Sequence, residues 1–336
     1  MKRCIRCVLP ETFPGIRFDD DGVCQYCRRT LSKGDRAARI AHLRTKFDEL
    51  VREVRSAPGY HCLMSWSGGK DSTYTLGVLC RDYGLRVLAF TFDNGFVSPG
   101  AMDNMRTVAD NLGVDHVIIR PSFPFLRELF VASAAPGMYS PKALERASGI
   151  CSTCMGLAKG IALRIALEKS IPMMAYGWSP GQIPLASAIL RPQRKMLQSM
   201  VEAAAAPLNK VSAGQASVFF PEAYHFQGVA QMPTNVSPLI FLDWREETAV
   251  QAIETYGWRR PDDTDPNSTN CLLNVLANRV HIQQMGYHPY AMELSGLVRE
   301  GYMSREEALQ RLASPPSEDS ILLVAERLGM SAGALQ

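Results

Sequence analysis

The segment Ser67-Gly68-Gly69-Lys70-Asp71-Ser72 combines residue types that bind phosphate. The apolar stretch HCLMSW precedes it, and a helical pattern starts at about Asp71. Adjacent glycines let backbone N–H groups approach an anion, and the N-terminus of a helix adds the positive end of its dipole. The segment is not a Walker A motif, because the four-residue gap before Gly-Lys is missing. It therefore predicts a phosphate cradle of another kind.

Four cysteines near the N-terminus have the spacing of metal ligands. Cys4, Cys7, Cys24 and Cys27 form two CxxC pairs separated by 16 residues. Each pair can supply two thiolates from a tight turn, and four thiolates satisfy tetrahedral Zn²⁺. Such a closed site has no open position for a substrate, so we predict a structural zinc, with iron in a four-thiolate site as the alternative.

Three further cysteines form a less decisive pattern. Cys151 and Cys154 make a third CxxC pair, and Cys271 lies far downstream. The pair could act in redox or sulfur-carrying chemistry, or the three thiols could be inert or bind zinc. We expect Cys154 and Cys271 each to lie at the start of a helix, whose dipole would favour the thiolate form. We also expect all three thiols to lie close together beside Gly68.

The elements that must position these residues follow from the periodicity of the chain. Strand and helix patterns alternate between residues 58 and 180, which predicts βαβ units and a parallel sheet. Apolar residues recur at helical spacing from about 35 to 54, and helical signals dominate after residue 244. We expect a zinc-binding module over 1–33, a linking helix over 34–57, a nucleotide-binding α/β domain over 58–180, an insert or lid over 181–243 and a helical C-terminal region over 244–336.

The composition is that of a globular protein. Hydrophobic residues make up 46% and charged residues 21% of the 336, which excludes a mainly disordered, collagen-like or coiled-coil chain. The net charge of +3 is too small to argue for a nucleic-acid partner, and we interpret the basic excess over 28–55 as a solvated helix face. No apolar run approaches the roughly 20 residues of a membrane span, so we expect a cytoplasmic protein without membrane contact. Cys62 and Cys80 have no patterned spacing, and we expect them to be buried apolar thiols.

The order of strand, SGGKDS and helix resembles the PP-loop signature SGGxDS of the ATP pyrophosphatase superfamily. The resemblance implies cleavage of ATP between the α and β phosphates with Mg²⁺, and transfer of AMP to an acceptor oxygen. By position, Lys70 would stabilise phosphate charge, and Asp71 would help to hold Mg²⁺. The residues expected around the departing pyrophosphate are Ser67, Gly68, Gly69, Lys70, Asp71 and Ser72, with Asp93 nearby.

Both ends of the chain resemble a narrower family, the N-acetyl sugar amidotransferases of surface-polysaccharide synthesis. The matching stretches are CIRCVLPETFPGIRFDDDGVCQYC at the start and the region from Tyr256-Gly257-Trp258 through Thr269-Asn270-Cys271 to Ser304-Arg305-Glu306-Glu307. The resemblance implies that ammonia from a separate glutaminase displaces AMP from an adenylated acetamido oxygen. After residue 177 this chain departs from the family and reads Trp178-Ser179-Pro180-Gly181-Gln182 in place of an acidic segment.

The CxxC pair with a distant cysteine resembles the PP-loop enzymes that thiolate tRNA. In those enzymes such thiolates hold a 4Fe-4S cluster with one open iron, which would make Cys151, Cys154 and Cys271 iron-sulfur ligands that act in catalysis with Lys70 and Asp71. A sulfurtransferase acting on tRNA or a small molecule, with a separate sulfur donor, is therefore the alternative to an amidotransferase. A third reading is a nucleotide-binding regulator that contacts a partner through its zinc module, and a homodimer is one option for the assembly.

Overall fold

The computed structural model describes residues 2–264, 268–315 and 317–330, and within them six strands form one sheet. The sheet order is β3-β2-β1-β4-β6-β5, and every neighbouring pair is parallel except β5 with β6. The alternation of strand and helix patterns thus correctly predicted a parallel α/β sheet. The strands are β1 Cys62–Ser65, β2 Val87–Phe92, β3 Asp115–Ile119, β4 Met173–Tyr176, β5 Ile189–Leu190 and β6 Thr234–Val236.

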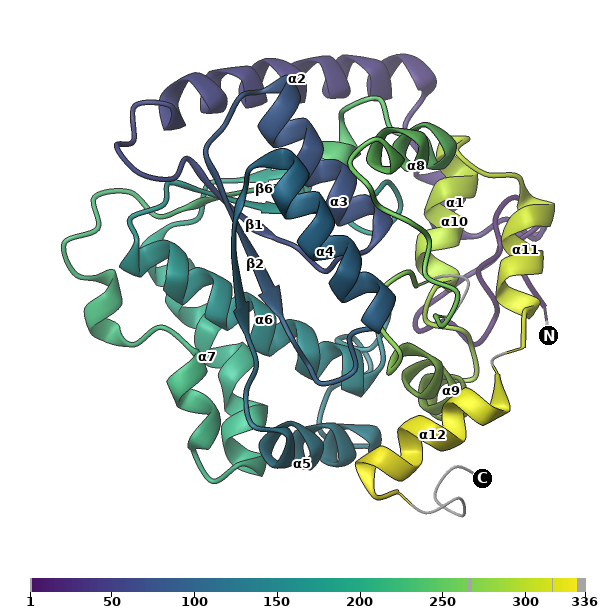
Figure 1. Cartoon of the computed structure of the whole chain (residues 1–336). Coiled ribbons are helices and arrows are strands. Elements are labelled where there is room, and N and C mark those ends of the chain that lie inside the picture. The colour runs from purple at the N-terminus through teal and green to yellow at the C-terminus, as the bar shows by residue number, and fades with distance from the viewer. Residues whose placement is uncertain (1, 265–267, 316, 331–336) are drawn as a thin grey trace.

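Helices cover both faces of the sheet (Figure 1). In β1, Cys62 and Met64 pack against α2, α3 and α4, while Leu63 packs against α6 and α7. The helices are α1 Gln25–Arg28, α2 Lys33–Val54, α3 Lys70–Gly77, α4 Pro99–Leu112, α5 Phe123–Ala134, α6 Gly149–Glu168, α7 Arg194–Val211, α8 Glu246–Glu254, α9 Asn274–Met285, α10 Ala291–Glu300, α11 Arg305–Ala313 and α12 Glu318–Leu328. Short helical segments are η1 Val78–Asp82, η2 Leu185–Ser187, η3 Gln215–Phe219, η4 Ala223–Phe226 and η5 Pro238–Ile240.

The sheet continues beyond residue 180, where we expected it to end. Strand β6 adds to β4 in parallel, and β5 pairs with β6 at the sheet edge. Between these strands the chain forms the long helix α7, inside the stretch 181–243 that we expected to be an insert or lid. Pro207 lies inside α7 and removes one backbone donor, but the run of alanines before it favours the helix and Leu208 anchors it in the core. The boundary at 180 is therefore too early for the sheet.

Helix α6 is both long and apolar. By length and composition alone this helix could cross a membrane. From the sequence we did not identify it as a candidate membrane span. In the structure Ile161, Ala162 and Leu163 of α6 pack beneath the sheet, so its apolar composition is explained by its position in the core.

The N-terminal cysteine segment packs against α10 and α11 of the C-terminal region (Figure 1). The four cysteines share an apolar cluster with Tyr287, Ala291 and Met292 of the α10 region. The Val8 N–H donates to Ser295 Oγ at 3.3 Å, and the Arg305 side chain donates to the carbonyl oxygen of Cys7 at 3.1 Å. This packing joins α10 and α11 to the N-terminal segment and sets them beside the loop that follows β1.

Candidate active site and metal centre

The SGGKDS segment joins β1 to α3, in the strand, loop and helix arrangement that we predicted. Gly68 has a φ of +79°, and a Cβ at this position would lie 3.2 Å from the carbonyl oxygen of Ala101 in α4. Gly69 is the N-cap of α3, so Lys70 is the first residue of that helix. The indole N–H of Trp258 donates to the carbonyl oxygen of Gly68 at 3.0 Å. Glycine is thus required at position 68, where both the backbone conformation and the close approach of α4 exclude a side chain.

The two serines of the segment form hydrogen bonds across the loop. The hydroxyl oxygens of Ser67 and Ser72 are 3.0 Å apart, and Ser72 Oγ donates to the carbonyl oxygen of Gly69 at 3.0 Å. A Cβ on Gly177, which follows β4, would lie 2.5 Å from Ser72 Cα. The loop is therefore held in shape by neighbouring backbone.

Lys70 and Asp71 form a half-buried ion pair at the start of α3. Lys70 Nζ lies 3.0 Å from Asp71 Oδ2, and the indole N–H of Trp244 donates to Asp71 Oδ1 at 3.1 Å. Burial alone would lower the pKa of Lys70, but the negative charges of Asp71 and Glu246 raise it above its ordinary value. The lysine is therefore fully charged at neutral pH and suited to stabilise phosphate oxygens.

The residues after β2 lie at the same edge of the sheet. Asp93 accepts the N–H of Gly95 at 2.8 Å and lies 3.6 Å from the guanidinium of Arg120. The side-chain amide of the next residue, Asn94, donates to the sulfur atoms of Cys154 and Cys271, each at 3.5 Å. Asn94 was not among the predicted site residues, and its only sequence signal was its place directly after Asp93.

The structure brings Cys154 and Cys271 together although they are 117 positions apart in the chain. Because both sulfur atoms are 3.5 Å from one amide nitrogen, they are at most 7.0 Å apart. Cys151 lies one helical turn before Cys154, and all three thiols are partly buried against the same apolar cluster. They are not as tightly grouped as the four N-terminal cysteines, which form the only group in the described residues with ligand atoms all within 4.8 Å.

Two details of the cysteine prediction are corrected. Helix α6 begins at Gly149, so Cys151 lies in its first turn and Cys154 follows it, and Cys271 precedes α9 by three residues. The expected thiolate is also not favoured in the metal-free protein. Burial and the neighbouring Cys271 thiol raise the pKa of Cys151 to about 11, and burial raises the pKa of Cys154 and of Cys271. Desolvation outweighs the helix dipole here, because these thiols face apolar side chains.

The segment before Cys271 connects the cysteines to the glycine-rich loop. Thr269 Oγ1 accepts the N–H of Lys70 at 3.1 Å, and the carbonyl oxygen of Asn270 accepts the N–H of Ser98 at 2.9 Å. Cys271 itself pairs in an antiparallel bridge with Val97. Thr269 is therefore a residue of the site that sequence reasoning placed only within a family resemblance, without a role.

A small cavity of about 30 Å³ lies on the side of Lys70 that faces the C-terminal helices. Burial raises the pKa of the Glu293 carboxyl in this cavity to about 7, with Asp71 adding to the rise and Lys70 opposing it. Glu293 was not predicted, because a glutamate on an amphipathic helix gives no sequence signal. The cavity is lined by Lys70, Ser179, Trp244, Glu246, Thr269, Tyr290, Glu293, Leu294, Leu297 and Arg311.

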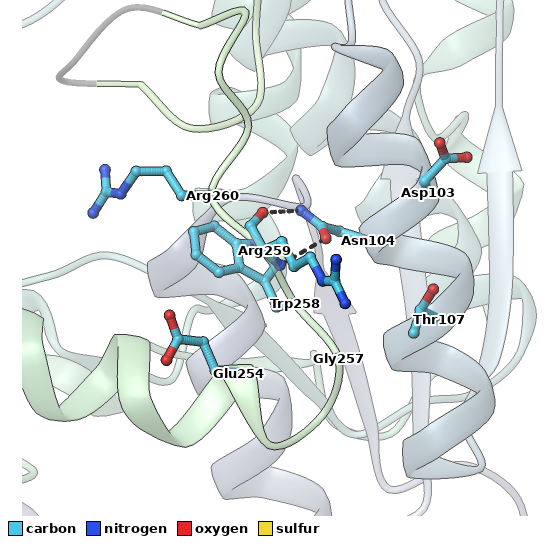
Figure 2. A pocket seen from close by; sticks show the side chains of 8 residues that line it. All are labelled: Asp103, Asn104, Thr107, Glu254, Gly257, Trp258, Arg259 and Arg260. Atoms are coloured by element: carbon cyan, nitrogen blue, oxygen red, sulfur yellow. Dashed lines mark hydrogen bonds between the residues drawn. The ribbon is translucent and has the colours of Figure 1, made fainter.

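A larger cavity of about 610 Å³ lies between α4 and the chain that follows α8 (Figure 2). Asn104 of α4 makes two hydrogen bonds with the backbone of Arg259, of 2.6 and 2.8 Å. The adjacent Trp258 belongs to the wall of this cavity and also contacts Gly68. Its lining carries Asp103 and Glu254 as well as Arg259 and Arg260, so the cavity has no dominant charge.

The four N-terminal cysteines have the geometry of a tetrahedral metal site. The sulfur atoms of Cys4 and Cys27 are 3.8 Å apart, and those of Cys7 and Cys24 are 3.7 Å apart. Four thiolates at the usual Zn–S distance of about 2.3 Å would have their sulfur atoms about 3.8 Å apart. The residues therefore fit a single four-coordinate ion, and all four are buried.

Comparisons with known proteins find a relative by sequence and several solved structures with some likeness to this chain. No family model matches the chain. An uncharacterized protein of Methanocaldococcus jannaschii is 21% identical over 330 residues, which cover 98% of this chain and 99% of that protein. The U34-tRNA thiolase NcsA of Methanococcus maripaludis, solved with its 4Fe-4S cluster, has a TM-score of 0.37 and 16% identity, covering 90% of this chain and 87% of that one. NMN synthetase of Francisella tularensis has a TM-score of 0.39 and 10% identity, covering 90% and 98%.

At TM-scores below 0.5 these likenesses carry no functional argument. The relative from M. jannaschii has nearly the same length as this chain, but it is uncharacterized and therefore indicates no activity.

Proposed function

We propose that this chain is a PP-loop enzyme that splits ATP into AMP and pyrophosphate in order to adenylate an acceptor oxygen. The observation that carries the proposal is the SGGKDS loop between β1 and α3, at the carboxyl end of a parallel sheet. Ligands of open α/β sheets bind in the crevice outside these strand ends. The resemblance of this loop to the PP-loop signature implies that the leaving group is pyrophosphate.

The loop residues would act on the phosphates as follows. The N-terminus of α3 and the backbone N–H of Gly68 would attract the departing pyrophosphate, whereas the N–H groups of Gly69 and Lys70 already donate to Ser67 and Thr269. Lys70 keeps its positive charge and neutralises the negative charge that develops as the bond between the α and β phosphates breaks. Mg²⁺, when bound, would shield the phosphate oxygens, and Asp71 is the carboxylate at this loop that could help to hold it.

For the second step we propose that a nitrogen nucleophile displaces AMP from the acceptor, as in N-acetyl sugar amidotransferases. The stretches that resemble this family lie at the two ends of the sequence. In the structure these ends pack against each other and against the crevice. The acceptor would be an N-acetyl sugar, and a separate glutaminase would supply ammonia.

A second candidate function is favoured by one observation, the convergence of Cys154 and Cys271 on Asn94. The spread of the sulfur atoms suits a polynuclear cluster better than a single zinc ion, because each cysteine of a cluster binds a different iron. With Cys151, the three thiols would hold a 4Fe-4S cluster that leaves one iron open for a sulfur ligand. The nucleophile would then be sulfide, and tRNA or a small molecule would be the acceptor.

Product analysis separates these candidates. The full chain is purified anaerobically, analysed for zinc, iron and sulfide, and incubated with ATP, Mg²⁺ and either UDP-N-acetylglucosamine or unmodified tRNA. Ammonium chloride and sodium sulfide serve as alternative nucleophiles. AMP and pyrophosphate are the expected products, whereas ADP and phosphate alone would refute the proposed reaction. An amidino sugar made from ammonium supports the first candidate, and a thiolated product supports the second.

A further inference from the structure

Glu293 of α10 lines the cavity beside Lys70, and its position there is fixed by backbone packing. A Cβ on Gly181, in the loop after β4, would lie 2.5 Å from the carbonyl oxygen of Glu293. On the next turn of α10, a Cβ on Gly296 would lie 2.5 Å from Gly181 Cα. Helix and loop are therefore in backbone contact, which holds the Glu293 side chain in the same cavity as Lys70 and Thr269.

Among the described carboxylates of this cavity, Glu293 is the one without a basic partner. Asp71 is paired with Lys70 at 3.0 Å, and Glu246 with Arg311 at 3.2 Å. The side chain of Glu293 instead accepts a hydrogen bond from the neutral amide of Gln182. The charged groups that act on it from the surrounding elements are Lys70, Asp71, Arg146 and Arg311. A carboxylate held by a neutral donor can take up a proton without breaking an ion pair.

The chemistry of the proposed reaction requires a base in one step only. In adenylation, the neutral acetamido oxygen attacks the α phosphate and has no proton to lose. In the second step, ammonia forms a C–N bond to the activated carbon and must give up a proton before the C–O bond to AMP breaks. The proton needs an acceptor, and the electron pair of the broken bond leaves with AMP, so no oxidant or reductant is involved.

We infer that Glu293 is a further catalytic residue, the general base that takes the proton from the incoming nucleophile. This inference rests on the proposed function. Lys70 cannot serve, since it is already protonated, and Asp71 and Glu246 are engaged by their cations. A hydrosulfide nucleophile would also have to lose its proton, so the role is the same for either donor.

The test separates the two steps. The full chain and the variants Glu293→Gln and Glu293→Asp are assayed with ATP, Mg²⁺ and UDP-N-acetylglucosamine. Exchange of labelled pyrophosphate into ATP, without a nucleophile, reports adenylation. Formation of amidino sugar from ammonium chloride, or of thiolated sugar from sodium sulfide, reports the whole reaction. Glu202→Gln, an exposed carboxylate on α7, is the matched control.

We expect Glu293→Gln to keep pyrophosphate exchange within about twofold while product formation falls roughly 100- to 10,000-fold, the usual contribution of a general base. Glu293→Asp should recover part of the loss. Unchanged product formation, or an equal fall in both steps, would overturn the role of Glu293 alone. Lack of exchange by the wild-type enzyme would instead overturn the proposed function, and this inference with it.

Discussion

The Glu293 carboxyl makes a prediction about stability that does not depend on any ligand. Its pKa in the folded protein is about 7, raised by burial from an ordinary value of 4.5. A carboxyl whose pKa is raised on folding contributes its full stability below the unfolded value, and that contribution is lost as the pH rises through the folded value. The free energy of unfolding of the wild-type protein should therefore fall between about pH 4.5 and pH 7 from this residue alone.

The substitution Glu293→Gln removes this titration and keeps an amide that mimics the protonated acid. Each pKa unit corresponds to about 1.4 kcal/mol, so the variant should be more stable than the wild type by about 3 kcal/mol near pH 8.5. Near pH 5 the two proteins should differ by less than about 1 kcal/mol. For a chain of this length, about 3 kcal/mol corresponds to a rise of about 4 °C in melting temperature.

Thermal unfolding followed by circular dichroism at the two pH values measures this difference. The exposed control Glu202→Gln should change the melting temperature little at either pH. If Glu293→Gln shifts the melting temperature equally at both pH values, or destabilises the protein near pH 8.5, the assigned environment of Glu293 is wrong. Such a result would mean that the carboxylate has a cationic partner in solution.

Other changes test the loop and the two cysteine sites. Lys70→Ala and Asp71→Ala should each abolish AMP formation while the circular dichroism spectrum stays native, because Lys70 would stabilise the phosphate charge and Asp71 would help to hold Mg²⁺. Retained turnover would contradict this assignment. Cys27→Ser should remove zinc and unfold the N-terminal segment, since a structural zinc contributes roughly 10 to 16 kcal/mol in zinc-finger peptides; metal analysis and thermal unfolding measure this, with Cys80→Ser as the unpatterned control. Asn94→Ala should leave zinc unchanged but lower the iron content of anaerobically purified protein, because partners that hydrogen-bond to ligands typically contribute 10- to 100-fold to metal affinity; equal iron in variant and wild type would argue against a cluster at Cys154 and Cys271.

Sequence reasoning succeeded where the relevant contacts are local. The strand, glycine loop and helix from residue 62 to 77 are consecutive, so their apolar periodicity and glycines indicate the arrangement directly. The two CxxC pairs predicted a four-thiolate group for the same reason, and its sulfur atoms do gather. The roles assigned to Lys70, Asp71 and the cysteines remain predictions.

Helix and sheet boundaries were less accurate in the middle of the chain. The short strands β5 and β6 have two and three residues, too few for an alternating pattern to stand out. They are strands because β6 pairs with the edge of β4 and β5 pairs with β6, and the first of these pairings joins segments that are far apart in the sequence. Pro207 removes one hydrogen bond from α7, but packing of α7 against α6 and α5 compensates for that loss.

The sequence by itself determined the reactive groups of this protein: a glycine-rich loop with a lysine and an aspartate, four cysteines at metal-ligand spacing, and a parallel sheet. Only the tertiary structure decided which distant residues complete the site. Lys70 meets Thr269 across 199 positions, Asn94 meets Cys271 across 177, and Trp244 meets Asp71 across 173. Spacing along the chain reports contacts within a turn or a helix, whereas these contacts depend on how the C-terminal helices fold back onto the strand ends. The environment of Glu293 arises in the same way, because a carboxylate on an amphipathic helix acquires its raised pKa only from the elements that bury it.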